Sequence, residues 1–101
     1  MERAIDDFFY ENRIVHVFEM PYKPPKAGGK NIYPDFYLPE YNLYIEYFGN
    51  NDDAYIRNRD NKIKMYHLDP SIRFEYLTFE DDPEIYERLK GICRKYNIPL
   101  K

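Results

Sequence analysis

The stretch YPDFYLPEYNLYIEYFG, residues 33–49, restricts the fold of this chain more than any other segment. It is mostly aromatic and aliphatic, and the Pro-Glu-Tyr-Asn sequence at residues 39–42 is typical of a turn between two strands. The predicted hairpin carries Asp35 near the start of its first strand and Glu46 deep in the second. Because a charge in an apolar strand is rarely left unpaired, the hairpin predicts that these carboxylates have specific partners.

The assumed turn also sets the register of the hairpin. It places Leu38 opposite Leu43, and counting outward places Asp35 opposite Glu46 on one face. Directly opposed side chains have Cβ atoms about 5 Å apart, and like charges at that spacing repel. The pair therefore predicts a cation between the two acids, and Mg²⁺ or Mn²⁺ suits carboxylate oxygens. An alternative remains: Asp35 merely begins its strand, while Glu46 pairs with a nearby Arg or Lys.

Length and composition are typical of one small domain covering residues 1–101. The 101 residues are 44% hydrophobic and 33% charged, which is enough apolar surface for a modest core. The single cysteine, Cys93, cannot form an internal disulfide and is expected in the core. No signal peptide or long apolar run is present, so we expect a soluble, cytoplasmic protein with no membrane partner.

The net charge of −3 argues against a protein that holds nucleic acid by bulk charge. The charge is unevenly distributed, however, because the acids concentrate near the two ends of the chain. Basic residues form two groups that could meet phosphates: Lys23, Lys26 and Lys30, and then Arg57, Arg59, Lys62 and Lys64. Solvated surface lysines are the alternative for each group.

The periodicity of the whole chain predicts the order α-β-β-β-α-β-α. The expected elements are a helix at 2–13, a strand at 14–22, a loop at 23–31, the hairpin at 33–48, a helix at 50–67, a strand at 71–80 and a helix at 81–98. Asp82 is the expected N-cap of the last helix, with Pro83 at its first position. This order predicts an α/β (α+β) fold with one sheet and helices packed on it.

Pro34-Asp35, followed after ten residues by Glu46, and the string YIEYFG resemble the PD-(D/E)xK, restriction-endonuclease-like nuclease superfamily. The nearest likeness is to very-short-patch-repair-type and helicase-associated small nuclease domains, whose PDF strand and IEYFG-like strand form the active-site hairpin. The resemblance implies an αβββαβ core with a central mixed four-stranded sheet, here with an extra C-terminal helix.

The same resemblance implies Mg²⁺- or Mn²⁺-dependent hydrolysis of DNA in repair or recombination, leaving a 5′-phosphate. Asp35, Glu46 and the backbone carbonyl at Tyr47 would hold the metal. It further implies DNA as substrate and a helicase or other DNA-processing protein as partner. A domain this small would need two copies to cut both strands, which predicts a homodimer.

This sequence departs from the superfamily pattern at one position, where Phe48 replaces the lysine expected two residues after the acid. On the following helix, Arg59, Lys62 and Tyr66 fall on the side of Tyr55, at 100° per residue. We therefore expect Lys62 to be the relocated lysine and Arg59 a phosphate contact. A purely surface role for Lys62 remains the alternative.

Glu2 is the remaining catalytic candidate, because many relatives carry an acid on the first helix that helps to hold metal-bound water. Its preference for a helix N-terminus is the structural alternative. Glu19, His16 and His67 rank lower as metal-associated or general-base candidates. Two rival functions remain open: a nuclease-fold module that binds DNA structure or docks a partner without catalysis, and a protein-interaction domain.

Overall fold

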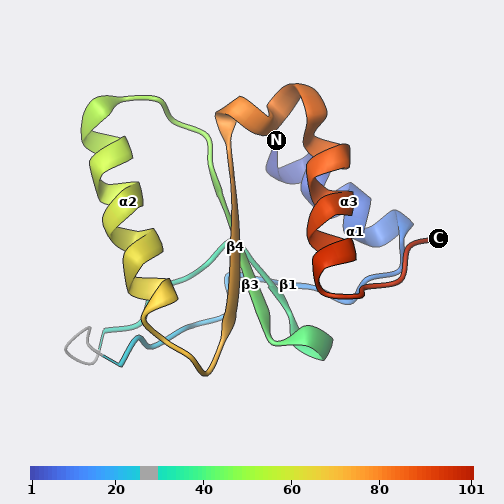
Figure 1. The fold of residues 1–101 in the computed structure, drawn as a ribbon, viewed down its shortest axis with the longest axis horizontal. Coiled ribbons are helices and arrows are strands. Elements are labelled where there is room, and N and C mark those ends of the chain that lie inside the picture. Colours follow the sequence, from blue (N-terminus) through green and yellow to red (C-terminus); the bar gives the residue numbers. More distant parts are fainter. Residues whose placement is uncertain (26–29) are drawn as a thin grey trace.

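The computed structural model describes residues 1–25 and 30–101. One four-stranded sheet, in the order β1-β2-β3-β4, forms its centre (Figure 1). The strands are β1 (Val17–Phe18), β2 (Phe36–Leu38), β3 (Leu43–Phe48) and β4 (Arg73–Thr78). β1 and β2, and β2 and β3, pair antiparallel, whereas β3 and β4 pair parallel. The sheet is therefore mixed, as predicted.

Helices cover both faces of the sheet. α1 (Glu2–Glu11) and α3 (Ile85–Lys95) lie together on one side, and α2 (Asp53–His67) lies on the other (Figure 1). Two short 3₁₀ helices, η1 (Pro39–Tyr41) and η2 (Phe79–Glu84), complete the described elements. The chain thus has an α+β architecture in three layers, with the sheet in the middle. Within the described residues, no helix has the length and apolar character needed to span a bilayer.

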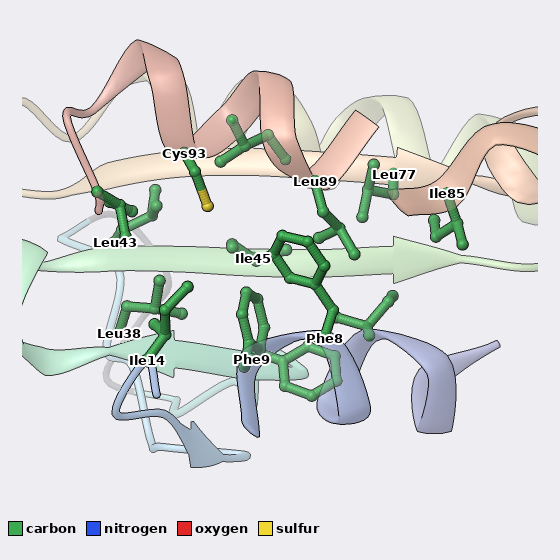
Figure 2. Packing of buried hydrophobic residues seen from close by; sticks show 14 residues of the cluster. Phe8, Phe9, Ile14, Leu38, Leu43, Ile45, Leu77, Ile85, Leu89 and Cys93 are labelled. Carbon is green, nitrogen blue, oxygen red and sulfur yellow. The ribbon is translucent and has the colours of Figure 1, made fainter. Parts of the chain in front are cut away.

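The larger core fills the space between the sheet and the α1–α3 layer (Figure 2). Phe8 and Phe9 of α1 and Leu89 of α3 pack over Ile45 of β3. Cys93 is buried in the same cluster, as predicted. This apolar contact fixes which face of the hairpin is the inner one, because successive side chains of a strand point to opposite faces.

A smaller aromatic cluster lies beneath α2. It consists of Tyr22, Tyr44, Tyr66 and Phe74, and the Tyr66 and Phe74 rings stack with their centroids 4.0 Å apart. α2 itself begins after the N-cap Asp52 and ends at His67, close to the predicted end. Stacked aromatic side chains therefore pack α2 against one end of the sheet, and polar groups have room further along this face.

The first strand is much shorter than predicted. Only Val17–Phe18 is a strand, and Tyr22 pairs with Ile32 in an isolated bridge. Glu19 has a φ of 50°, and this left-handed residue interrupts the predicted strand, whereas Arg13, with a φ of 55°, ends α1 just before it. The apolar, β-branched sequence did not reveal these two turns.

The predicted start of the last helix is wrong. The Thr78 hydroxyl accepts a hydrogen bond from Glu80 N, and the Asp81 carboxylate accepts one from Thr78 N. These two bonds form a capping box at the start of η2, several residues upstream of α3. α3 then begins at Ile85. Asp82 is not its N-cap, and its carboxylate accepts a hydrogen bond from the Tyr47 hydroxyl at 2.6 Å.

Candidate active site

The register of the β2–β3 hairpin is the one predicted from its turn. Leu38 lies opposite Leu43 and Phe36 opposite Ile45. Phe36 and Ile45 belong to the α1–α3 core, so the alternation of side chains directs Glu46, the next residue of β3, to the α2 face, whereas Asp35 lies in a bend just before β2. The charges of Glu46 and Lys62 both act on Asp35, so the two predicted acids lie close together at this end of the hairpin.

Glu46 is buried at the centre of the sheet, with 3% of its surface exposed. Its Oε1 accepts a hydrogen bond from Lys62 Nζ at 3.0 Å. Its Oε2 has no hydrogen-bond partner in the described part of the chain. Burial raises the pKa of Glu46, and the Lys62 ammonium opposes that rise. The carboxylate is thus only half satisfied by its lysine.

The ladder between β2 and β3 stops at Phe36, and Asp35 makes a different contact. Its Oδ2 accepts a hydrogen bond from Tyr47 N at 2.7 Å. Burial raises the pKa of Asp35 to about 6; the Tyr47 amide opposes this, and the charges of Glu46 and Glu2 add to it. The acids therefore repel each other and outnumber the single ammonium between them.

The backbone of Tyr47 adds a third oxygen to this group. Its N–H points toward β2, where it meets Asp35, and in an antiparallel pair the C=O of the same residue points the same way. The β2–β3 register ends at Phe36–Ile45, so no residue of β2 pairs with Tyr47. Pro34, which precedes Asp35, has no N–H to donate to the Tyr47 carbonyl.

These oxygens match what a hard divalent cation binds. Carboxylate and carbonyl oxygens are the preferred ligands of Mg²⁺, which also retains several waters. Glu46 Oε2 is a buried acceptor without a partner among the described residues, and the Glu46 charge raises the pKa of the nearby Asp35, after burial. No group of three or more His, Cys, Asp or Glu side chains that could hold a metal occurs among residues 1–25 and 30–101. A metal centre here would therefore depend on two carboxylates and a main-chain carbonyl.

α2 presents the predicted side to the sheet. Tyr55, Arg59, Lys62 and Tyr66 are buried or half-buried, whereas Lys64, on the opposite side, is exposed. The Lys62 side chain is 38% exposed and still reaches Glu46, so its ammonium lies at the edge of the buried region. The pairing of Glu46 with a lysine, which the sequence left open as the alternative to a metal, is thus present.

Arg59 is less exposed than a surface arginine, with 16% of its side chain accessible, and its Nε lies 3.4 Å from Asp60 Oδ1. Burial raises the pKa of Tyr55, the Asp35 and Glu46 carboxylates add to the rise, and the Arg59 guanidinium opposes it. Arg59 and the two acids therefore all lie near Tyr55.

Phe48, at the position where the superfamily has its lysine, is a core residue with 4% exposure. Its ring packs edge-on against Tyr55 of α2 and Tyr76 of β4. The end of β3 is therefore closed by aromatic contacts, and the only described cation hydrogen-bonded to Glu46 is Lys62 of α2.

A cleft of about 340 Å³ borders the Asp35 side of the site. Its lining comprises Glu2, Arg3, Asp6, Phe18, Glu19, Asp35 and Phe36. Glu2 is exposed there, and its charge contributes to the raised pKa of Asp35. Glu19 N donates to the Asp35 carbonyl at 3.2 Å. Both glutamates thus lie near Asp35, and neither is hydrogen-bonded to its carboxylate.

Other predicted residues lie apart from the acidic pair. Lys23 and Lys30 are exposed next to the Tyr22–Ile32 bridge, and Lys26 lies outside the described residues. His16 contacts Asp6 and the Ile14 carbonyl, linking α1 to the segment that follows it. His67 is exposed at the end of α2.

Sequence reasoning gave no role to the Tyr66 hydroxyl, which is buried without a hydrogen-bond partner in the described part of the chain. Its spacing of four residues from Lys62 was the available signal, since i and i+4 share a helix face.

Comparisons with models of protein families, with curated proteins and with solved structures find no match for this chain. The case for a function therefore depends on the residues of the site. Its distinguishing features are the half-satisfied Glu46, the neighbouring Asp35 and the ammonium of Lys62.

Proposed function

We propose that this chain is a metal-dependent nuclease of the PD-(D/E)xK, restriction-endonuclease-like type that hydrolyses phosphodiester bonds of DNA. The observation that carries the proposal is the buried Glu46, whose Oε2 has no partner in the described chain and whose charge acts on the neighbouring Asp35. Burying an unpaired carboxylate oxygen is costly unless a cation or donor satisfies it. A protein that merely needed stability would gain by losing this charge.

Asp35, Glu46 and the Tyr47 carbonyl are the groups that would hold Mg²⁺ or Mn²⁺. Such an ion supplies Lewis acidity and lowers the pKa of water. The protein contributes the fixed placement of the oxygens. Asp35 is oriented by the Tyr47 amide, and in the metal-free protein Glu46 is held by Lys62.

Lys62 supplies positive charge for the phosphate that is being cleaved. Its ammonium is at the edge of the buried region, so it is able to donate to a non-bridging phosphate oxygen and stabilise charge that develops in the transition state. Arg59, on the same side of α2, contacts a neighbouring phosphate. The loop lysines Lys23, Lys26 and Lys30 bind the DNA backbone further away. Glu2, beside Asp35, helps to hold the attacking water.

The second candidate is a nuclease-fold module that binds DNA or a partner such as a helicase without cleaving. The Lys62–Glu46 ion pair favours it, because a lysine already neutralises one oxygen of the buried acid. Phe48 in place of a lysine favours it as well. The two candidates differ in metal affinity: the nuclease requires one ion on Asp35 and Glu46, whereas the module requires only its basic residues.

Calorimetric titration with Mn²⁺ tests the proposal. Wild type should bind one ion, and Asp35→Asn and Glu46→Gln should each abolish binding and metal-dependent cleavage while the fold is kept. Glu40→Gln is a matched control, because Glu40 is an exposed acid in η1 at the opposite end of the hairpin. Equal Mn²⁺ binding by all four proteins would refute the metal centre. Mn²⁺ binding without cleavage of any DNA would favour the inactive module.

A further inference from the structure

Two buried side-chain atoms without hydrogen-bond partners occur among the described residues: Glu46 Oε2 and the Tyr66 hydroxyl oxygen. One is an acceptor and the other can donate. Tyr66 is 1% exposed, so bulk water does not satisfy its hydroxyl. Since buried polar groups are nearly always hydrogen-bonded, each atom calls for an explanation.

The fold places these two groups in the same region between α2 and β3. Tyr66 follows Lys62 by one helical turn on the same face of α2, and Lys62 donates to Glu46 Oε1. The Tyr66 ring is held between Phe74, at 4.0 Å, and Tyr22, at 5.5 Å. The hydroxyl is therefore fixed in the protein interior by stacked rings and is not free to turn toward solvent.

Electrostatics identifies the acid that this hydroxyl senses most. Burial raises the pKa of Tyr66, and the charge of Glu46 and then that of Asp35 raise it further. Glu46 therefore lies near enough to the Tyr66 hydroxyl for its charge to act on it. By contrast, the groups that raise the pKa of Tyr44, besides burial, are Tyr37 and Asp69.

We propose that Tyr66 is a positioning residue for Glu46: its hydroxyl donates to one buried water, which in turn donates to Glu46 Oε2. The carboxylate is then held on both oxygens from neighbouring turns of α2, by Lys62 on Oε1 and by Tyr66 on Oε2. A single water with two such partners satisfies the Tyr66 hydroxyl and one lone pair of Glu46 Oε2, and the second lone pair of that oxygen stays open to a cation. The consequence for metal binding rests on the proposed function, whereas the hydrogen-bonded link does not.

The link is tested in the metal-free protein by a double-mutant cycle. Tyr66→Phe and Glu46→Met are measured singly and together by urea unfolding in the presence of a chelator. In the wild-type background, Tyr66→Phe should raise the equilibrium constant for unfolding about tenfold. In the Glu46→Met background, Tyr66→Phe should leave this constant unchanged. If Tyr66→Phe instead stabilises the protein, or has the same effect in both backgrounds, the hydroxyl does not act on Glu46 and the inference is overturned.

The role in positioning is tested by Mn²⁺ calorimetry, with Tyr44→Phe as the matched control. Tyr44 belongs to the same aromatic cluster, so its substitution removes a hydroxyl from similar surroundings. Tyr66→Phe should weaken Mn²⁺ binding about tenfold, as loss of an outer hydrogen bond to a ligand does, and Tyr44→Phe should leave it unchanged. Unchanged Mn²⁺ affinity in Tyr66→Phe would overturn the positioning role while the metal centre stands. Absence of Mn²⁺ binding in wild type would refute the proposed function, and the unfolding cycle would still decide the link.

Discussion

Asp35→Asn should make the metal-free protein more stable at neutral and alkaline pH. The pKa of Asp35 is raised from 3.8 to about 6, chiefly by burial and further by Glu46 and Glu2. An acid with a raised folded-state pKa binds more protons in the folded than in the unfolded chain, so its ionisation opposes folding. The resulting loss of stability begins as pH rises above the unfolded pKa and is complete above about pH 6. Asparagine removes the charge and keeps an oxygen that accepts from Tyr47 N.

The size of the effect follows from the shift. A rise from 3.8 to about 6 corresponds to an upper limit of about 3 kcal/mol at 1.36 kcal/mol per pKa unit. Solvent screening at the half-buried Asp35 reduces this, so we expect a gain of about 1–2 kcal/mol. For a domain of 101 residues this is a rise in melting temperature of roughly 5–10 °C. Near pH 4 the difference should nearly vanish, because the folded wild type is then largely protonated at Asp35.

Thermal unfolding in the presence of a chelator, at about pH 8 and about pH 4, measures the difference in melting temperature between Asp35→Asn and wild type at each pH. Glu40→Gln, which removes an exposed acid, is the control for net charge. Saturating Mn²⁺ should reverse the ranking at pH 8, because an ion that binds only the folded wild type stabilises it. If Asp35→Asn is no more stable than wild type at pH 8, or if its gain in stability is the same at pH 4, ionisation of Asp35 does not oppose folding and the reasoning is refuted.

Three further predictions concern the basic and aromatic residues. Lys62→Met should lower the single-turnover cleavage rate about 100-fold or more, whereas the exposed Lys64→Met should not. Neutralising the three lysines of the 23–30 segment should flatten the salt dependence of DNA binding, with Mn²⁺ affinity unchanged by calorimetry. Phe48→Lys should destabilise the fold by about 3–5 kcal/mol in urea unfolding without raising cleavage, because Phe48 is buried between two rings.

Sequence spacing alone was sufficient to predict the register of the hairpin and the side of α2 that faces the sheet. A turn between Leu38 and Leu43 leaves one compatible register, because a slip of one residue would expose the core side chains. The helical period then separates the half-buried Lys62 from the exposed Lys64. Both predictions are confirmed because each depends on spacing within a single element or on one tight turn.

The remaining features depend on contacts between distant segments. The shortening of the first strand follows from the left-handed Glu19, a position that carries no glycine or asparagine signal. The start of α3 is displaced because Thr78 provides a cap upstream, and Asp82 is used by Tyr47 instead. Periodicity describes one element at a time, so it does not predict which of two caps the packed chain will use.

A final prediction concerns the competition between Lys62 and a metal ion for Glu46. Lys62 and a divalent ion both neutralise the Glu46 carboxylate, and a positive charge beside the site also repels an incoming cation. Because the Lys62 side chain is 38% exposed, its ammonium is able to leave Glu46 without being buried elsewhere. Metal binding should therefore release Lys62 for the substrate phosphate.

It follows that Lys62→Met should strengthen Mn²⁺ binding by roughly three- to tenfold while it slows cleavage. Calorimetry and single-turnover kinetics on the same variant measure the two effects. Weaker Mn²⁺ binding by Lys62→Met, with Lys64→Met unchanged, would mean that Lys62 helps to build the metal centre and does not compete with the ion for Glu46.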